Sequence, residues 1–148
     1  METGSHIRVI LGRTANAVER VDRASIAATG LIASEFGILE ALLHKGPLPI
    51  NTIGRKVLLT SGSMTAAADR LVDKDLVERR RDPDDRRRVH LHLTADGHRV
   101  ITDAYAKHAR NLETVAAVLT PDERNELVRL LRKIGCHADA MMRGGIAT

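Results

Sequence analysis

The highest local density of charged side chains in the sequence is a run of arginines interrupted by aspartates. Between Glu78 and Arg88 the chain reads Glu-Arg-Arg-Arg-Asp-Pro-Asp-Asp-Arg-Arg-Arg, so six of eleven residues are arginine. A guanidinium is always charged, and its planar fork of N–H donors matches phosphate oxygens. The whole chain carries 23 Lys and Arg against 19 Asp and Glu, a formal charge of only +4. The local concentration of charge, more than the total, therefore indicates a polyanionic partner, although a run like this taken alone is also typical of a solvated loop.

A second polar set precedes the arginines and is expected to lie on one helix face. Apolar residues recur at helical spacing over residues 61–73, and the opposite face carries Ser61, Ser63, Thr65 and Arg70. Small hydroxyl side chains suit a helix that enters the DNA major groove, which is about 12 Å wide. The free N–H groups of the first turn favour phosphate. Helix capping is the alternative role for the serines, and Thr60 is placed to share it.

The arginine run and the polar helix face belong to a predicted sequence of short elements, two helices followed by a β-hairpin. Residues 50–57, after Pro49, and residues 61–73 predict two helices joined by a tight connection. Residues 76–80 predict a strand, and Val89-His90-Leu91-His92-Leu93 alternates strictly, as a half-buried strand does. The Asp-Pro-Asp-Asp turn joins the two strands into a hairpin. The pattern predicts a winged helix-turn-helix, with double-stranded DNA as the partner. The expected DNA contacts are Ser61, Ser63, Thr65, Arg70, Arg79, Arg81, Arg86, Arg87 and Arg88.

Longer helices flank this unit. The sequence predicts helices over residues 7–28, over residues 34–44 with Ser34 as N-cap, over residues 95–119 after Thr94, and from Pro121 onward. Residues 1–6 are expected to be a flexible start, in which Gly4-Ser5-His6 resembles a cloning remnant. Apolar stripes on the terminal helices would stay partly exposed in one compact domain, which predicts a homodimer.

From about residue 34 to residue 100 the chain resembles the MarR (multiple antibiotic resistance) family of bacterial transcriptional regulators. The motifs that carry the resemblance are Thr60-Ser61-Gly62-Ser63-Met64-Thr65, Asp69-Arg70-Leu71-Val72, Leu76-Val77-Glu78-Arg79, Asp82-Pro83-Asp84-Asp85-Arg86-Arg87 and Leu93-Thr94-Ala95-Asp96-Gly97. The segment from His44 to Ile50, together with Ile53-Gly54 and Val57-Leu58-Leu59-Thr60, is similar to the quinone- and hydroquinone-responsive branch.

The resemblance implies a mainly α fold with a small β-hairpin wing and with N- and C-terminal dimerisation helices. The chain is then a single MarR-type domain over residues 1–148, with a DNA-binding lobe at about 34–94 and dimerisation helices at about 7–30 and 95–143. It implies a homodimeric repressor of a pseudo-palindromic operator, released by a small ligand. By position, Asp85 would orient the wing through an ion pair, and Arg87 would enter the minor groove.

A small aromatic effector, either an acid, a phenol or a quinone, is expected where the first, second and fifth helices meet the DNA-binding lobe. The residues expected to line its pocket are Phe36, His44, Tyr105 and His108. Apolar walls with a few polar groups are the usual composition of such a site. Phe36 as a core residue and Tyr105 as a packing residue are the alternatives.

The alternatives to this interpretation are a metal-responsive regulator and an enzyme. Seven histidines allow a zinc-responsive regulator of the same fold, through His90 and His92 or through convergence of His44, His108 and Cys136. An enzyme is not expected, because the sequence has no phosphate-binding glycine loop and no nucleophile elbow. No cofactor is expected either. Cys136 is the only cysteine, which excludes an internal disulfide. With no apolar run of transmembrane length, the expected compartment is the bacterial cytoplasm, at the nucleoid.

Overall fold

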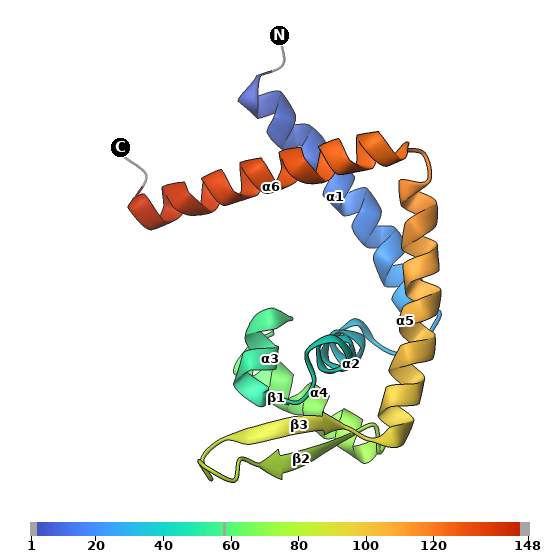
Figure 1. Cartoon of the computed structure of the whole chain (residues 1–148), viewed down its shortest axis with the longest axis vertical. Helices are drawn as coiled ribbons and strands as arrows, with labels where there is room; N and C mark the ends of the chain where they lie inside the picture. Colours follow the sequence, from blue (N-terminus) through green and yellow to red (C-terminus); the bar gives the residue numbers. More distant parts are fainter. Residues whose placement is uncertain (1–2, 58, 146–148) are drawn as a thin grey trace. The chain divides into compact units, whose positions relative to one another are not determined.

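A computed structural model of the chain describes residues 3–57 and 59–145. It contains, in order, α1 (Gly4–Ala27), α2 (Ala33–Lys45), β1 (Leu48–Pro49), α3 (Ile50–Lys56), α4 (Ser61–Asp73), β2 (Val77–Arg81), β3 (Val89–Leu93), α5 (Ala95–Ala116) and α6 (Pro121–Gly144) (Figure 1). The chain divides into two compact units, residues 1–112 and residues 113–148. The predicted mainly helical fold with a small β wing is confirmed.

The helix-turn-helix forms as the periodicity predicted. The Thr60 hydroxyl caps α4 by accepting a hydrogen bond from the Ser63 N–H at 3.2 Å. Met64, Ala67, Ala68 and Leu71 of α4 are buried, one face of the helix. Gly54 of α3 is also buried, and a Cβ at this position would lie 3.4 Å from the Met64 side chain. The short helix therefore packs closely against α4. Leu58, part of the sequence motif, lies outside the described residues.

The wing is a hairpin to which the structure adds a third strand. β2 and β3 pair antiparallel with Val77 opposite Leu93 and Arg81 opposite Val89. β1 pairs with the other edge of β3, so the sheet order is β1-β3-β2. The sequence pattern does not predict a strand at Leu48 and Pro49. A strand of two residues is too short to show an alternation of apolar and polar side chains. Pro49 is tolerated because β1 is an edge strand.

The base of the wing contacts the first turn of α5 closely, through Leu76, Thr94 and Gly97. The Thr94 N–H donates to the Leu76 carbonyl at 3.1 Å, and the Thr94 hydroxyl accepts from the Gly97 N–H at 2.9 Å. A Cβ placed on Gly97 would lie 1.8 Å from the Leu76 oxygen. Only glycine fits where the first turn of α5 crosses the strand entry. The predicted capping role of Thr94 is confirmed.

Two predicted helix starts were wrong. α1 begins at Gly4, because the Thr3 side chain caps it through the His6 N–H, so Gly4–His6 is helical, while Met1 and Glu2 lie outside the described residues. α2 begins at Ala33 with Ile32 at the N-cap and no side-chain cap. Ser34 is therefore inside the helix, and its hydroxyl has a tertiary partner instead.

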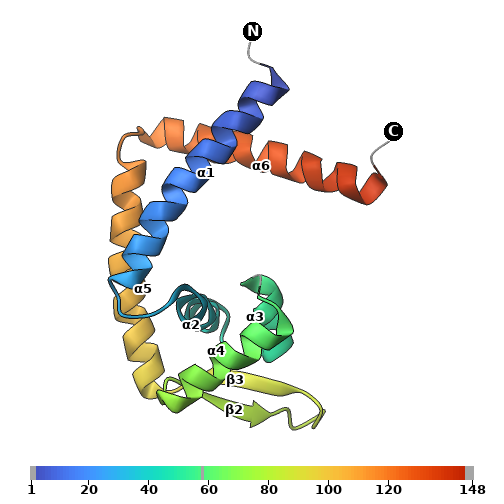
Figure 2. The same cartoon turned by 180° about the vertical axis from the view of Figure 1, so that it is seen from behind.

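The core of the first unit lies between α2, α3, α4, α5 and the sheet. Its fully buried side chains include Phe36, Ile38, Leu39, Ile53, Leu71, Leu91 and Ile101. Figure 2 shows the unit from behind, where α2 and α4 lie against the sheet. The result is a rigid support that presents α4 and the hairpin at one end of the unit.

The second unit contains α6, which has a full capping box between Thr120 and Glu123 and Pro121 in its first turn, as predicted. None of the residues of α6, all of them described, is buried. Its large exposed apolar side chains are Leu127, Val128, Leu130, Leu131, Ile134, Met141 and Met142. On α1 the corresponding set is Ile7, Ile10, Val18 and Val21. Among the described helices, none combines the length and apolar character needed to cross a bilayer.

Candidate nucleic-acid interface and effector site

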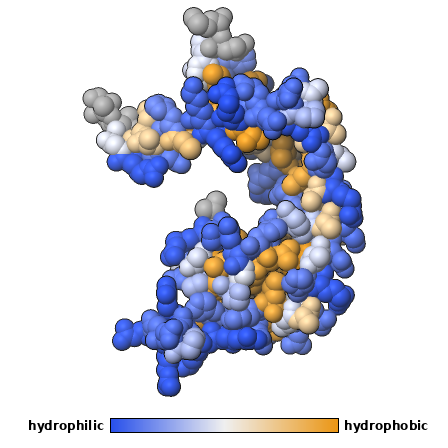
Figure 3. Space-filling view, viewed as in Figure 1, coloured by the Kyte–Doolittle hydropathy of each residue, from blue (hydrophilic) through white to orange (hydrophobic). Residues whose placement is uncertain are grey.

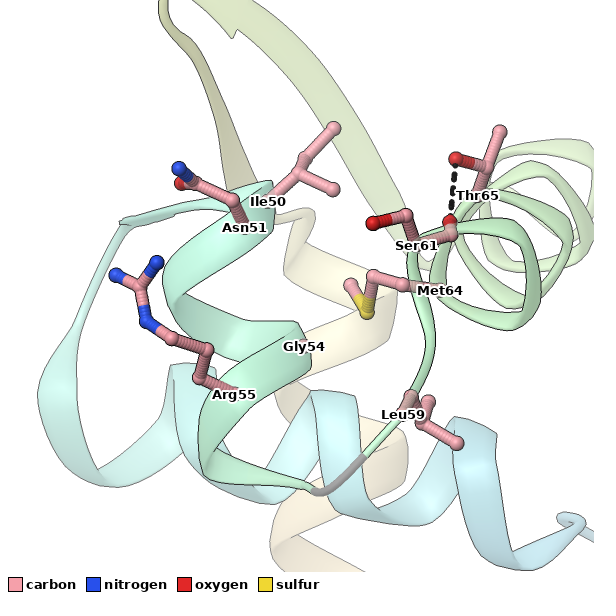
Figure 4. Close-up of a pocket in the computed structure, with 8 residues that line it drawn as sticks. All are labelled: Ile50, Asn51, Gly54, Arg55, Leu59, Ser61, Met64 and Thr65. Atoms are coloured by element: carbon pink, nitrogen blue, oxygen red, sulfur yellow. Dashed lines mark hydrogen bonds between the residues drawn. The ribbon is translucent and has the colours of Figure 1, made fainter.

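The polar face of α4 is solvent-exposed at its N-terminal end. Ser61, Ser63 and Thr65 are all exposed. The Thr60 hydroxyl donates to Ser63 Oγ at 3.0 Å, and the Thr65 hydroxyl donates to the Ser61 carbonyl at 2.9 Å (Figure 4). These contacts engage the Ser63 and Thr65 hydroxyls, and each of these oxygens can still accept a further hydrogen bond. The face is small and polar, as a groove-entering helix requires.

The wing arginines fall into two groups. Arg79 pairs with Asp69 of α4 and Arg80 pairs with Glu78, so these two guanidinium groups have carboxylate partners. Within the described part of the chain, no carboxylate forms an ion pair with any of the other four, Arg81, Arg86, Arg87 and Arg88. All four are exposed. In the space-filling view the projecting wing is covered by hydrophilic residues (Figure 3). The uncompensated charge therefore gathers at the tip.

The shape of the wing tip is set by Asp82. Its Oδ1 accepts hydrogen bonds from the N–H groups of Asp84 at 2.8 Å and Asp85 at 3.2 Å. These backbone donors hold the pKa of the Asp82 carboxyl below its ordinary value of 3.8, with smaller contributions from nearby His90 and Arg88. His90 Nε2 lies 3.7 Å from Asp82 Oδ2. Asp82 therefore closes the turn from which the free arginines project.

Asp85 does not make the predicted ion pair. Its Oδ1 accepts a hydrogen bond from the Arg87 N–H at 3.0 Å, and its carbonyl accepts from the Arg88 N–H at 2.9 Å. No cation of the described residues forms an ion pair with its carboxylate. A short aspartate side chain reaches an amide two residues ahead more readily than the end of a mobile, hydrated arginine. Asp85 orders the backbone that carries Arg87.

Arg70 points toward α2. Its Nε donates to Glu35 Oε1 and its Nη2 donates to Ser34 Oγ, each at 3.3 Å. Its side chain is 44% exposed. The predicted contact of Arg70 with DNA is untested, but the structure gives this residue a structural partner that the helical pattern did not reveal.

Sequence reasoning missed two residues of α3 beside the recognition helix. Asn51 and Arg55, both exposed, share a shallow cavity of about 220 Å³ with Ser61 and Thr65, and Figure 4 shows these polar side chains at its rim. A second hollow, of about 320 Å³, runs from Asn51 to Arg87 and Arg88. Arg55 could have been found from the sequence as an arginine on the polar face of the first helix of the helix-turn-helix. In such motifs that helix crosses the DNA backbone.

The four predicted effector residues form two separate ring pairs. Phe36 and His108 make an edge-to-face contact with centroids 5.0 Å apart, and His44 and Tyr105 make another at 4.7 Å. A cavity of about 370 Å³ lies beside the first pair, and its walls are Asp22, Ile26, Ala33, Ser34, Phe36, Gly37, Glu40, Lys56, Val57, Leu59 and His108. His44 and Tyr105 are not among them. The structure therefore places the predicted pocket residues at two locations, and only Phe36 and His108 line this cavity.

His108 is the polar centre of this cavity wall. Its Nε2 lies 3.1 Å from Asp22 Oδ1, and its Nδ1 lies 3.1 Å from Ser25 Oγ. The Ser25 oxygen accepts a hydrogen bond from the Asn111 amide at 2.8 Å. A carboxylate only accepts, so Nε2 carries a hydrogen, and in the neutral ring Nδ1 accepts from the Ser25 hydroxyl. The sequence reasoning missed Asp22 and Ser25, which lie more than eighty positions from His108.

The zinc alternative finds no support in the described residues, among which no three His, Cys, Asp or Glu side chains are grouped to hold a metal ion. His44 faces Tyr105, and His108 is engaged by Asp22 and Ser25. Burial lowers the pKa of His92 below its ordinary value of 6.5, so it adds little charge to the wing at neutral pH. Cys136 is an exposed free thiol on α6.

Comparisons with known proteins agree with this geometry. The profile of the MarR family matches residues 31–89. The chain is 33% identical over 130 residues to the HTH-type transcriptional regulator MhqR of Bacillus subtilis, covering 88% of this chain and 90% of that protein.

Solved structures agree as well. A mutant MarR from E. coli complexed with operator DNA has a TM-score of 0.73 at 25% identity, covering 90% of this chain and 99% of that one. The PcaV regulator from Streptomyces coelicolor in complex with its natural ligand has a TM-score of 0.71 at 26% identity, covering 86% and 92%. The chain belongs to the MarR family of DNA-binding, winged-helix transcriptional regulators.

Proposed function

We propose that this protein is a homodimeric repressor that binds a pseudo-palindromic operator and leaves it when a small phenolic or quinone-type ligand binds. The observation that carries the DNA-binding half is the wing, where Arg81, Arg86, Arg87 and Arg88 are exposed and have no ion-pair partner among the described residues. The hairpin and α4 lie at the same end of the first unit (Figure 1). Operator binding would place its action at the nucleoid of the bacterial cytoplasm.

The docking follows from the geometry. α4 enters the major groove with Ser61, Ser63 and Thr65 toward the bases or phosphates, while Arg87 at the wing tip enters the adjacent minor groove. Asn51 and Arg55 of α3 lie where the first helix of the pair meets the phosphate backbone. Arg79 is assigned to positioning, because Asp69 already neutralises it.

The homodimer is supported by the apolar surface of the terminal helices. α6 has seven large exposed apolar side chains and none buried, and α1 has four exposed ones. Monomeric soluble proteins rarely leave contiguous apolar surface of this kind in water. Pairing of two chains would cover it and would place two recognition helices on half-sites about one helical turn apart.

The ligand class is supported by the cavity beside His108. Its volume of about 370 Å³ suits a single substituted ring, and Ile26, Phe36, Val57 and Leu59 give it apolar walls. Its charged groups are two carboxylates, Asp22 and Glu40, and one ammonium, Lys56. This balance repels an aromatic carboxylate and favours a ring that donates hydrogen bonds. Among the aromatic ligands expected from the sequence, a phenol or hydroquinone therefore fits best.

The test selects bound duplexes from a random library and then titrates hydroquinone and benzoate against the selected complex. The proposal expects a pseudo-palindromic sequence, a complex of two chains per duplex, and release by hydroquinone at lower concentration than by benzoate. A monomer on a single half-site would contradict the dimer. Equal release by both compounds, or release by neither, would contradict the ligand class.

A further inference from the structure

We infer that the hydrogen bond between Arg70 of α4 and Ser34 of α2 couples the effector cavity to the recognition helix. The inference rests on the proposed function, since it assigns the route by which that cavity controls DNA affinity. It is carried by one juxtaposition: Ser34 lines the cavity, and its hydroxyl is also the acceptor of a recognition-helix arginine.

The contact belongs to a small cluster around one buried carboxylate. Glu35 has a side chain only 2% exposed, and its carboxylate receives Arg70 Nε at 3.3 Å and Lys74 Nζ at 2.9 and 3.1 Å. A buried carboxylate without partners is strongly unfavourable, so this cluster fixes the angle at which the last turns of α4 meet the start of α2. The N-terminal turn of the same helix carries Ser61, Ser63 and Thr65.

Arg70 and Lys74 have different positions in the cluster. Lys74 contacts both oxygens of Glu35, and no hydrogen bond of the described residues joins it to Ser34. Arg70 divides its guanidinium between Glu35 and Ser34. Lys74 alone can keep Glu35 neutralised, while only Arg70 reaches the cavity wall. Replacing Lys74 removes only a positive charge beside Glu35, whereas replacing Arg70 also removes the hydrogen bond to Ser34.

The mechanism follows from this division. A ligand that hydrogen-bonds Ser34, or displaces the first turn of α2 in which Ser34 lies, removes one of the two anchors of Arg70. The guanidinium then reorients toward Glu35 alone, and α4 shifts relative to α2. Because α4 is one uninterrupted helix of 13 residues, a shift at its C-terminal end moves its DNA-binding end. Shifts of about 1–2 Å in packed helices are typical of such transitions.

The first part of the test needs no ligand and is a double-mutant cycle on operator affinity with Ser34→Ala and Arg70→Gln in the full-length protein. Ser34 lies in the cavity wall and outside the set of DNA-contacting residues proposed above, so a merely local role predicts no loss of operator affinity. The inference expects Ser34→Ala to weaken operator binding severalfold, Ser34→Thr to restore it, and Ser34→Ala to have no further effect in the Arg70→Gln background. Additive effects, or a neutral Ser34→Ala, would overturn the inference. A direct DNA contact of Arg70 cancels in the cycle.

The second part measures operator affinity with and without saturating hydroquinone, with Lys74→Gln as the charge-matched control. Coupling factors between sites are typically about 5–150-fold. We expect such a factor in the wild type and in Lys74→Gln, and a factor within about twofold of unity in Ser34→Ala and Arg70→Gln. Equal loss in Lys74→Gln would show that only the charge around Glu35 matters and would overturn the inference. A coupled cycle without any response of the wild type to hydroquinone would refute the ligand class while retaining the link between cavity wall and helix.

Discussion

The Nε2 of His108 on α5 lies 3.1 Å from Oδ1 of Asp22 on α1, and both residues line the cavity beside Phe36. His108 is 7% exposed and Asp22 is 37% exposed, so the ring is enclosed while the carboxylate still reaches the cavity. The histidine fixes the direction of the acceptor that a ligand hydroxyl would meet. The sequence predicted His108 for an effector site, and the structure pairs this residue with Asp22.

Replacing His108 with glutamine is expected to weaken hydroquinone binding about tenfold, since a net hydrogen bond is worth about 1 kcal/mol and Asp22 would also lose its orientation. Isothermal titration calorimetry without DNA measures this. His44→Gln is the matched control, because His44 pairs with Tyr105 away from the cavity. An equal loss in both variants would show that the cavity beside His108 is not the binding site.

At the wing, Arg87→Ala is expected to cost about 1–3 kcal/mol of operator binding if Arg87 reads the groove. Arg79→Ala is expected to cost less, because Arg79 already pairs with Asp69 and has less free charge to give to DNA. Fluorescence anisotropy at one fixed salt concentration compares the two. A larger loss for Arg79 would reverse the assignment of reading and positioning roles.

The dependence of binding on salt tests the number of phosphate contacts. A dimer making on the order of 6–10 such contacts should lose roughly 10³–10⁵ in affinity between about 50 and 200 mM salt. Removing Arg86, which is exposed and forms no ion pair with a described residue, should reduce the slope of log affinity against log salt by about one per wing. A nearly flat dependence would contradict the role given to the wing.

Acidification should open the wing turn. The folded pKa of Asp82 is below the ordinary 3.8, so its stabilising hydrogen bonds are fully present above that value and are lost as the pH falls through the lower folded pKa. Amide resonances of Asp84 and Asp85 should therefore titrate together with a midpoint below 3.8. Asp82→Asn, which keeps the Oδ1 acceptor, should retain the turn at neutral pH, whereas Asp82→Ala should lose it. Retention of both amide signals in Asp82→Ala would contradict this account.

Gly97→Ala is expected to destabilise the fold strongly, by about 3 kcal/mol or more, because the new Cβ would lie 1.8 Å from a backbone oxygen that cannot move aside. Gly135→Ala on α6 is the control. No atom lies within 4 Å of its Cβ position, so alanine should stabilise the helix by about 0.5–1 kcal/mol. Equal thermal midpoints for the two variants would be inconsistent with the packing of α5 on the wing base.

The parts of the fold that follow from local patterns could be predicted from the sequence. α4, its Thr60 cap and the alternation of β3 depend on neighbouring residues alone. β1 could not be predicted, because its pairing with Leu91 depends on a strand more than forty residues away. The same limit applies to the partners of Arg70 and His108, which come from α2 and α1. For Asp85, a local hydrogen bond competes with the ion pair, and the loop geometry decides between them.

On the proposed function, the ligand and the operator each weaken the binding of the other to this protein. The direct measurement is the affinity of hydroquinone for the protein alone and for the protein saturated with its selected operator. Thermodynamic linkage requires that DNA weaken hydroquinone binding by the same factor by which hydroquinone weakens DNA binding. We predict equal factors of at least about fivefold in the two directions. Equal affinity of hydroquinone for free and DNA-bound protein would contradict the account.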